Sequence, residues 1–311
     1  MRRHPVLAAT VAGLLVLASA GALVVGHVVS SRPSGGIPVG AIPTSRATES
    51  VSPSVSPSGA ATPASTPTAT SRAAPAPAHF TTLPPGGALP SDARCAAWVL
   101  ARPIAENRAV NRGYNRVTGQ ALGGSFFPSS DDSRTNRLIG ARVDGKFTGT
   151  THEILRWAAC KWGIDEDIVA AQAVQESYWN QTAMGDWGSD STACPPGHGL
   201  GADDRSGQCP QSWGILQNRY PFEQASWPGI RNSTAMNADT AYAIWRACYD
   251  GYELWLNDVD RGRQYAAGDA WGCVGRWFAG RWHTSAADSY TASVQAILRQ
   301  RTWEQPGFLQ A

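Results

Sequence analysis

One glutamate stands out because its position in the sequence predicts apolar surroundings. Glu176 lies in the run Ala-Val-Gln-Glu-Ser-Tyr-Trp, near the end of a predicted helix. It follows Val169 by seven residues and Ala173 by three, so it shares their apolar face. Desolvation raises the pKa of a carboxyl, and a protonated carboxyl is the general acid that glycosidic bond cleavage requires. On periodicity alone, Glu176 could equally face solvent or pair with an arginine.

A second segment, Ser-Trp-Gly-Ile-Leu-Gln at residues 212–217, follows a loop rich in glycine and proline. Gly214 would let the backbone approach a ligand closely. The amide of Gln217 can both donate and accept hydrogen bonds. Taken alone, the segment is also compatible with a plain turn into a buried stretch. The succession of helix, glycine-rich loop and this segment is more specific than either half.

Helix signals surround the glutamate. Thr150 and Glu153 form a predicted capping box, and Gly163 ends the helix that follows. Asp165 then caps a second helix, which carries Glu176 near its end. The predicted site therefore lies on a helix that follows another helix directly.

Further helices are predicted later in the chain. One covers residues 237–248, and another begins at Ser285, where Asp288 completes the cap and Tyr290 lies on the apolar face. Strand-like alternation is scarce. We therefore expect a mainly α domain, with a disulfide-stapled loop or short hairpin at residues 189–213.

These residues carry a resemblance to a known family. Glu176-Ser177 resembles the Glu-Ser of the soluble lytic transglycosylases, lysozyme-like enzymes that cleave bacterial peptidoglycan. Gly-Ile-Leu-Gln at 214–217 is similar to the family's Gly-Leu-Met-Gln motif. Its Ala-Tyr-Asn-Ala-Gly motif is matched loosely by Arg-Trp-Phe-Ala-Gly at 276–280, where Trp277 and Phe278 replace tyrosine and asparagine. The other similarities, within a region of roughly 150–301, are Gly185, Asp186, Ser212, Tyr290 and Val294.

The resemblance implies a lysozyme-like fold and a lyase-type glycosidase reaction. Glu176 would protonate the β-1,4 bond between N-acetylmuramic acid and N-acetylglucosamine. It would then take the proton of the muramic C6 hydroxyl, which attacks C1 and leaves a 1,6-anhydro sugar. Tyr290 would orient Glu176. The residues implied to bind substrate are Ser177, Ser212, Gly214, Ile215, Gln217, Trp277 and Tyr290.

Other functions remain open. A hydrolytic lysozyme, or muramidase, needs a second carboxylate. Asp186 is the best candidate, ahead of Asp190, Asp203 and Asp204. We expect Asp203 and Asp204 to face solvent rather than to bind calcium. A catalytically inactive wall-binding module, or a stalked adhesin that holds polysaccharide through aromatic residues, would also fit.

The composition divides the chain into four parts. Residues 1–29 join two early arginines to a long apolar run, which predicts a cleaved signal peptide or an uncleaved signal anchor. Residues 30–90, rich in Ser, Pro, Thr and Ala, predict a disordered linker. A helical N-terminal extension at 91–149 and a transglycosylase domain at 150–311 would follow. The protein would be extracellular or anchored at the cell wall or membrane, touching a membrane only through an uncleaved N-terminal segment.

Cysteine content and charge narrow the class of protein. All six cysteines follow residue 90, and no Cys-X-X-Cys motif is present, so we expect disulfides and neither a metal nor a cofactor. Residues 91–311 hold 21 Lys and Arg against 23 Asp and Glu, which argues against nucleic-acid binding. We expect a monomer that acts on peptidoglycan glycan strands. The simplest disulfide pairing is sequential: Cys95–Cys160, Cys194–Cys209 and Cys248–Cys273.

Two further patterns concern the surroundings of the site. Residues 104–116 repeat Asn-Arg every four residues, and a helix there would place its asparagines on one face, as a solvated cap or as a groove wall. Aromatic rings can stack on sugars. Trp179, Trp187 and Trp213 could equally line a groove or pack in the core, whereas Trp157, Trp162 and Trp245 fit helical core faces.

Overall fold

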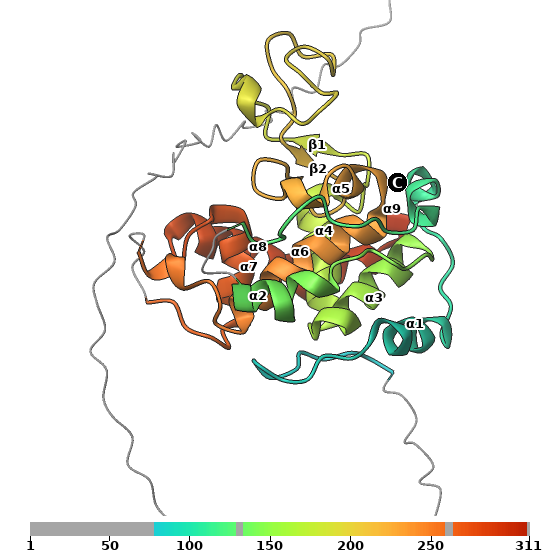
Figure 1. Ribbon diagram of the computed structural model, residues 1–311. Helices are drawn as coiled ribbons and strands as arrows, with labels where there is room; N and C mark the ends of the chain where they lie inside the picture. Colours follow the sequence, from blue (N-terminus) through green and yellow to red (C-terminus); the bar gives the residue numbers. More distant parts are fainter. Residues whose placement is uncertain (1–77, 129–132, 259–263, 310–311) are drawn as a thin grey trace, which may run out of the picture. The chain divides into compact units, whose positions relative to one another are not determined.

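The computed structural model describes residues 78–128, 133–258 and 264–309 (Figure 1). This part of the chain is mainly helical, with a small antiparallel sheet and three disulfides, as the sequence predicts. The predicted signal segment at 1–29 and most of the predicted linker lie outside the described residues. The strands are β1 (Met184–Gly185), β2 (Ser212–Trp213) and β3 (Asn218–Arg219). The helices are α1 (Asp92–Leu100), α2 (Ser133–Leu138), α3 (Thr151–Trp162), α4 (Glu166–Ser177), α5 (Gly229–Asn232), α6 (Thr234–Tyr249), α7 (Ala270–Ala279), α8 (Ser285–Gln300) and α9 (Pro306–Leu309).

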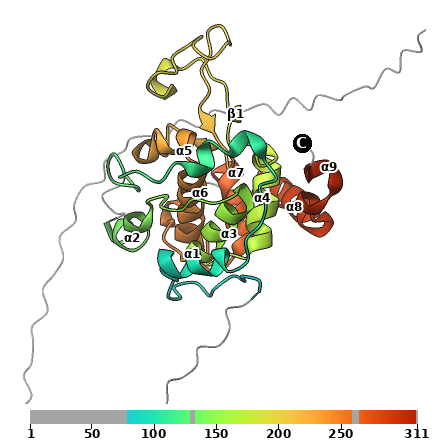
Figure 2. The ribbon, with the colours of Figure 1, turned by 90° about the vertical axis from the view of Figure 1, so that its right-hand side faces the viewer.

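Two helices form the centre of the core. Every residue of α6 is buried, and so is every residue of α3 except His152. Figures 1 and 2 show α3 against α6, with α1 on the outer side of α3. Helix α4 packs on α3 and on α8, and α8 packs in turn on α7. The buried α3–α6 pair thus supports the layer of α4, α7 and α8.

The caps of α3 and α4 are confirmed. The Thr150 hydroxyl accepts from the Glu153 backbone, and the Glu153 carboxylate accepts from Thr150 N at 2.8 Å. Gly163 ends α3 with φ 65°, and Asp165 caps α4 through Asp167 N at 2.9 Å. Because the connection between the two helices is this short, the start of α4 is set directly by the end of α3.

A tight turn ends α4 just after the candidate acid. Tyr178 and Trp179 have φ of 57° and 60°, a left-handed conformation that bulky residues seldom adopt. Trp179 is fully buried, and its indole N–H donates to Ala170 O at 2.9 Å. Asn111 donates to Trp179 O at 2.8 Å. These bonds hold the strained turn and so fix the last turn of α4.

The segment at 104–116 does not form the predicted helix. It makes two short 3₁₀ turns, and Asn111 and Asn115 are buried rather than solvated or in a groove wall. Both asparagines donate to the hydroxyl of Thr151, at 3.1 and 3.0 Å, and Asn111 also accepts from Gln181 N at 2.8 Å. Partners inside the protein use these amides, so the asparagines turn inward and the periodicity argument for a helix fails.

The strands are shorter than a hairpin over residues 189–213 would need, and only β2 lies within that range. Strands β1, β2 and β3 pair in that order, and all pairs are antiparallel. Between β1 and β2 the chain forms a loop, drawn in yellow, that stands away from the helices in both views (Figures 1 and 2). A bridge between Gly188 and Cys209 closes the base of this loop, and the Cys194–Cys209 disulfide staples it.

The sequential disulfide pairing is confirmed. Cys95–Cys160 joins α1 to α3, Cys248–Cys273 joins α6 to α7, and Cys194–Cys209 lies in the loop. Three disulfides indicate an oxidising, extracellular environment. Among the described residues, no helix is long and apolar enough to cross a membrane.

Two predicted boundaries are wrong. Residues 78–90 pack on the helices rather than continuing the linker: Phe80 contacts Trp98 edge to face, and Leu83 N donates to Gly163 O at 3.0 Å. Helix α8 is capped by Thr284, one residue before the predicted cap, because the Thr284 hydroxyl accepts from Ala287 N. A threonine beside a serine offers two equivalent caps, and sequence alone does not distinguish them.

Candidate active site

The carboxyl of Glu176 lies where three helices meet. It is carried by the last turn of α4, and its Oε1 accepts a hydrogen bond from the hydroxyl of Tyr290 on α8. The side chain of Trp277, on α7, also bonds to this carboxyl. An indole can only donate, so the carboxyl receives two donors that hold its orientation.

Burial raises the pKa of Glu176 to about 8. The hydrogen bond from Tyr290 lowers it, the negative charge of Asp186 raises it, and the bond from Trp277 lowers it, but burial prevails. By accessible surface the residue is only half-buried. Protein atoms thus enclose the carboxyl densely, while part of the residue remains exposed. With a pKa of about 8, the group is a protonated acid at neutral pH.

Tyr290 keeps its proton and therefore remains a donor. Its side chain is buried, and burial raises its pKa well above the usual value. Gln172, one turn before Glu176 on α4, bonds to the phenol oxygen. That bond lowers the pKa of Tyr290, as a donated N–H does. The chain of donors thus runs from Gln172 through Tyr290 to Glu176.

Replacing Tyr290 with phenylalanine should raise the pKa of Glu176 further above 8, because the hydroxyl that stabilises the carboxylate is lost. The measurement is an NMR titration of ¹³C-labelled glutamate carboxyls, with Glu176 assigned through its glutamine variant. Tyr249→Phe is the control, since Tyr249 stacks on Trp245 in α6 and should leave the titration unchanged. An unaltered pKa in Tyr290→Phe would show that this hydrogen bond does not act on the acid.

Asp186 is part of a polar row across the sheet. It follows β1, its carboxylate accepts from the hydroxyl of Ser212 on β2, and Arg219 on β3 lies 3.8 Å away. The register explains the row, because Gly185 pairs with Ser212 and Ser212 pairs with Arg219. Asp186 is exposed, and its charge acts on Glu176. It is therefore a carboxylate near the candidate acid with a different, more solvated environment.

Two of the three other aspartates considered for this role, Asp190 and Asp203, have local partners. Asp190 caps a turn through Thr192 N at 2.9 Å. Asp203 contacts the ring of His198 at 2.9 Å and is largely buried there, so the expectation that it faces solvent is wrong. Asp204 is exposed, with φ 63°.

The backbone of the Gly-Ile-Leu-Gln segment is hydrogen-bonded to buried side chains of the protein rather than left open for a ligand. Gly214 has φ 78°, and a Cβ there would overlap the amides of Asn237 and Gln181. Those amides also bond the segment: Ile215 N donates to Gln181 at 3.1 Å, and Leu216 N donates to Asn237 at 2.9 Å. The close approach that requires a glycine is thus to buried side chains.

Two side chains connect this segment to its neighbours. Ser177, at the end of α4, donates to Ile215 O at 2.8 Å. Gln217 turns its amide back onto Gly214 O at 2.9 Å and Ala183 O at 3.3 Å. Ile215 itself is fully buried. Ser177, Gly214 and Ile215 therefore position the end of α4 against the sheet.

Most of the tryptophans considered for the site or the core are buried. The core positions predicted for Trp157, Trp162 and Trp245 are confirmed, because all three are buried. Trp179 and Trp213 are buried too, so neither of them lines a groove. Trp187 is half-buried, with Arg205 over its ring at 4.1 Å. The sequence argument missed Phe278, whose side chain is exposed beside Tyr290. It follows Trp277 directly in α7, and its place in the loosely matched motif was the available signal.

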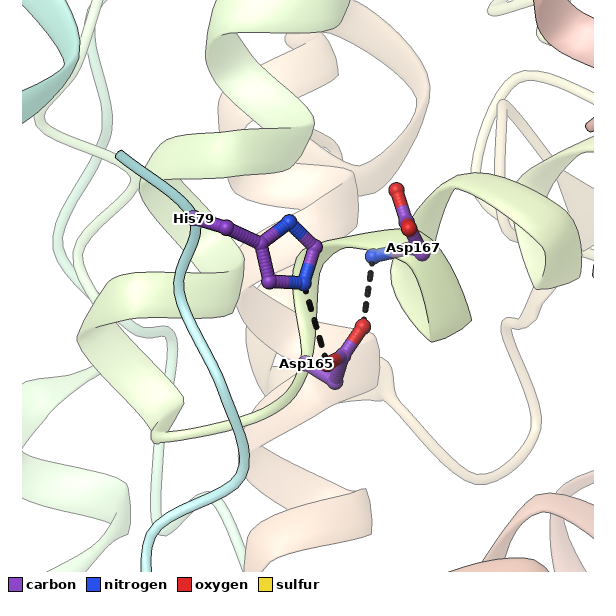
Figure 3. Close-up of side chains that lie close together, drawn as sticks. All are labelled: His79, Asp165 and Asp167. Atoms are coloured by element: carbon purple, nitrogen blue, oxygen red, sulfur yellow. Dashed lines mark hydrogen bonds and ion pairs between the residues drawn. The ribbon is translucent and has the colours of Figure 1, made fainter. Parts of the chain in front are cut away.

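One cluster has the spacing of a metal site, but its ligand atoms are already paired. His79, Asp165 and Asp167 lie together at the start of α4, and the His79 ring contacts Asp165 at 3.1 Å (Figure 3). The same ring contacts Glu166 at 2.9 Å. Asp167 pairs with Arg301. Burial lowers the pKa of His79, but the hydrogen bond and charge of Asp165 outweigh it and raise the pKa overall. The side chains of this cluster thus contact one another, Glu166 and Arg301.

A hollow of about 320 Å³ adjoins this cluster and is lined partly by Arg102, His152 and Arg301. It lies at the first turn of α4, whereas Glu176 lies in the last. A helix rises about 1.5 Å per residue, which separates the two places by roughly 15 Å. The hollow is therefore distinct from the surroundings of the candidate acid.

Compared with protein-family models, curated proteins and solved structures, the chain gives no match.

Proposed function

We propose that this protein is an exported enzyme with a lysozyme-like fold that cleaves the glycan strands of peptidoglycan as a lytic transglycosylase. The observation that carries the proposal is the carboxyl of Glu176, whose pKa is raised by burial to about 8 and which Tyr290 and Trp277 orient. The three disulfides fit an enzyme that works outside the cell. The sequence resemblance supplies the substrate class.

The reaction needs a single protein carboxyl. Glu176 gives its proton to the glycosidic oxygen as the bond from that oxygen to C1 of the muramic acid breaks. The C6 hydroxyl oxygen of the same sugar bonds to C1, and the Glu176 carboxylate takes the proton released. The acid is regenerated, no water is consumed, and a 1,6-anhydro end forms. A group whose pKa lies near 8 can serve both steps close to neutral pH.

A hydrolytic route is the second candidate, and Asp186 favours it. Its charge acts on Glu176, and its own environment is exposed and polar, with Ser212 and Arg219 as partners. Two carboxyl groups in contrasting environments are the arrangement in which one acts as acid and the other stays ionised. In this route Asp186 would activate water or stabilise positive charge at C1.

Mass spectrometry of the products distinguishes the two routes. Purified sacculi digested by the protein should release muropeptides with 1,6-anhydro ends, which lack one water relative to the hydrolysed product. Asp186→Asn should leave the anhydro products in place. Reducing ends, lost in Asp186→Asn, would assign the hydrolytic route instead. Sedimentation with sacculi without release of fragments would indicate a wall-binding module.

A further inference from the structure

Phe278 is an exposed aromatic ring placed beside the candidate acid. It lies near the end of α7, and the residue is 51% exposed. One face of its ring is covered, because it stacks on Tyr290 with ring centroids 4.9 Å apart and planes within 1° of parallel. The exposed surface must then come largely from its other face and edges. The ring is thus held flat by a buried partner and keeps an open surface.

The partner of this ring belongs to the acid. Tyr290, on which Phe278 stacks, donates its hydroxyl to Glu176, and Trp277, the residue before Phe278, bonds to the same carboxyl. Successive helical residues point roughly 100° apart, so Trp277 and Phe278 leave α7 in different directions. Trp277 reaches the acid directly, whereas Phe278 reaches it only through the Tyr290 ring. The open ring is therefore stacked on the tyrosine that orients the candidate acid.

An exposed apolar ring at this place suits a particular ligand surface. The face of an aromatic ring carries partial negative charge, and the axial C–H bonds of a pyranose present an apolar, weakly positive face. A polar residue here would leave the Tyr290 ring uncovered and would offer no flat surface.

We propose that Phe278 is a stacking platform for a sugar ring of the glycan strand next to the bond that Glu176 protonates. The inference rests on the proposed function for its substrate class. The Phe278 ring is preorganised, because the parallel Tyr290 ring fixes its orientation before a ligand arrives. Less conformational entropy is then lost on binding.

Binding of a soluble N-acetylglucosamine pentamer, measured by calorimetry, tests the platform. Every variant is made in the full chain carrying Glu176→Gln, so that no cleavage disturbs the measurement. Phe278→Ala should weaken binding about tenfold, Phe278→Trp should keep it within about twofold, and Phe278→Leu should fail to restore it. Leu100→Ala is the matched control, an exposed apolar residue at the end of α1, 56% exposed, that should bind as the parent does. Because Phe278 is exposed, its variants should unfold at nearly the parent temperature. If Phe278→Ala does not fold, the binding of Phe278→Leu decides the outcome.

The outcomes separate the platform from the enzyme. Equal binding by Phe278→Ala and the parent, no binding by the parent, or full binding by Phe278→Leu would overturn the platform. Failure of the unmodified protein to cleave sacculi, with ring-dependent binding intact, would overturn the proposed function alone. In a cleavage assay with Glu176 present, the platform predicts a raised KM with an unchanged kcat for Phe278→Ala. A lowered kcat with unchanged KM would instead assign Phe278 to the support of Tyr290.

Discussion

Glu176→Gln should lower the rate of glycan cleavage by about 10²–10⁴-fold, the usual contribution of a positioned general acid. Glutamine keeps the size of the side chain and can still accept from Tyr290, but it has no proton to give. The loss should be in kcat, because the substrate still binds. Release of soluble fragments from sacculi measures the rate. Glu304→Gln, an exposed carboxylate paired with Arg301, is the control and should leave the rate unchanged.

Stability separates a catalytic loss from a folding defect. Burial raises the pKa of Glu176 from 4.5 to about 8, so the folded protein binds its proton more tightly than the unfolded chain does. The stabilisation by this proton is fully present below about pH 4.5 and is lost as the pH rises to about 8. Glutamine has no such loss. Glu176→Gln should therefore be at least as stable as the parent at pH 9 in urea unfolding, and a much less stable variant would remove the catalytic interpretation of its inactivity.

Asp239→Asn should destabilise the fold by about 3–5 kcal/mol, the usual loss when one partner of a buried ion pair is removed. Lys161 would keep only the more exposed carboxylates of Asp144 and Asp92 as partners. Asp239 and Lys161 are both fully buried, with Oδ2 of Asp239 2.9 Å from Nζ of Lys161. Burial lowers the pKa of Lys161, but the charge and bond of Asp239 outweigh it and raise the pKa overall. The lysine therefore stays charged at neutral pH, where it needs the carboxylate.

Asp239 also satisfies backbone and indole donors. It accepts from Gly145 N and Asp144 N at 2.8 Å each and from Trp162 Nε1 at 2.8 Å. The pair thus joins α6, the end of α3 and the turn at residues 144–145. Urea unfolding measures the free energy, and Glu304→Gln again serves as the control, with a change below about 1 kcal/mol, as for exposed ion pairs. A loss of similar size in both variants would show that the buried network adds nothing beyond a surface pair.

Local signals predicted the helices around the site well. The capping box at Thr150 and Glu153 and the cap at Asp165 depend on side chains that bond to their own backbone nearby, so neighbouring residues suffice to find them. Periodicity placed Glu176 on the apolar face of its helix, but it left open whether the carboxyl turns to solvent or pairs with an arginine. The sequential disulfide pairing also holds, although no local signal required it.

Long-range contacts account for what the sequence did not show. Asn111 and Asn115 become internal through Thr151, some 40 residues away, and no period in 104–116 encodes that partner. Gly214 is required by Asn237 and Gln181, not by a ligand. Phe278 gained its place only when α7 packed on α8 and brought it onto Tyr290.

The most direct test of the central claim is the release of soluble muropeptides from purified sacculi between pH 5 and 9. We expect the unmodified protein to release them below about pH 8, with the rate falling above that pH as Glu176 loses its proton. Glu176→Gln should release almost none at any pH. Absence of release by the unmodified protein at every pH, or equal release by both proteins, would contradict the account.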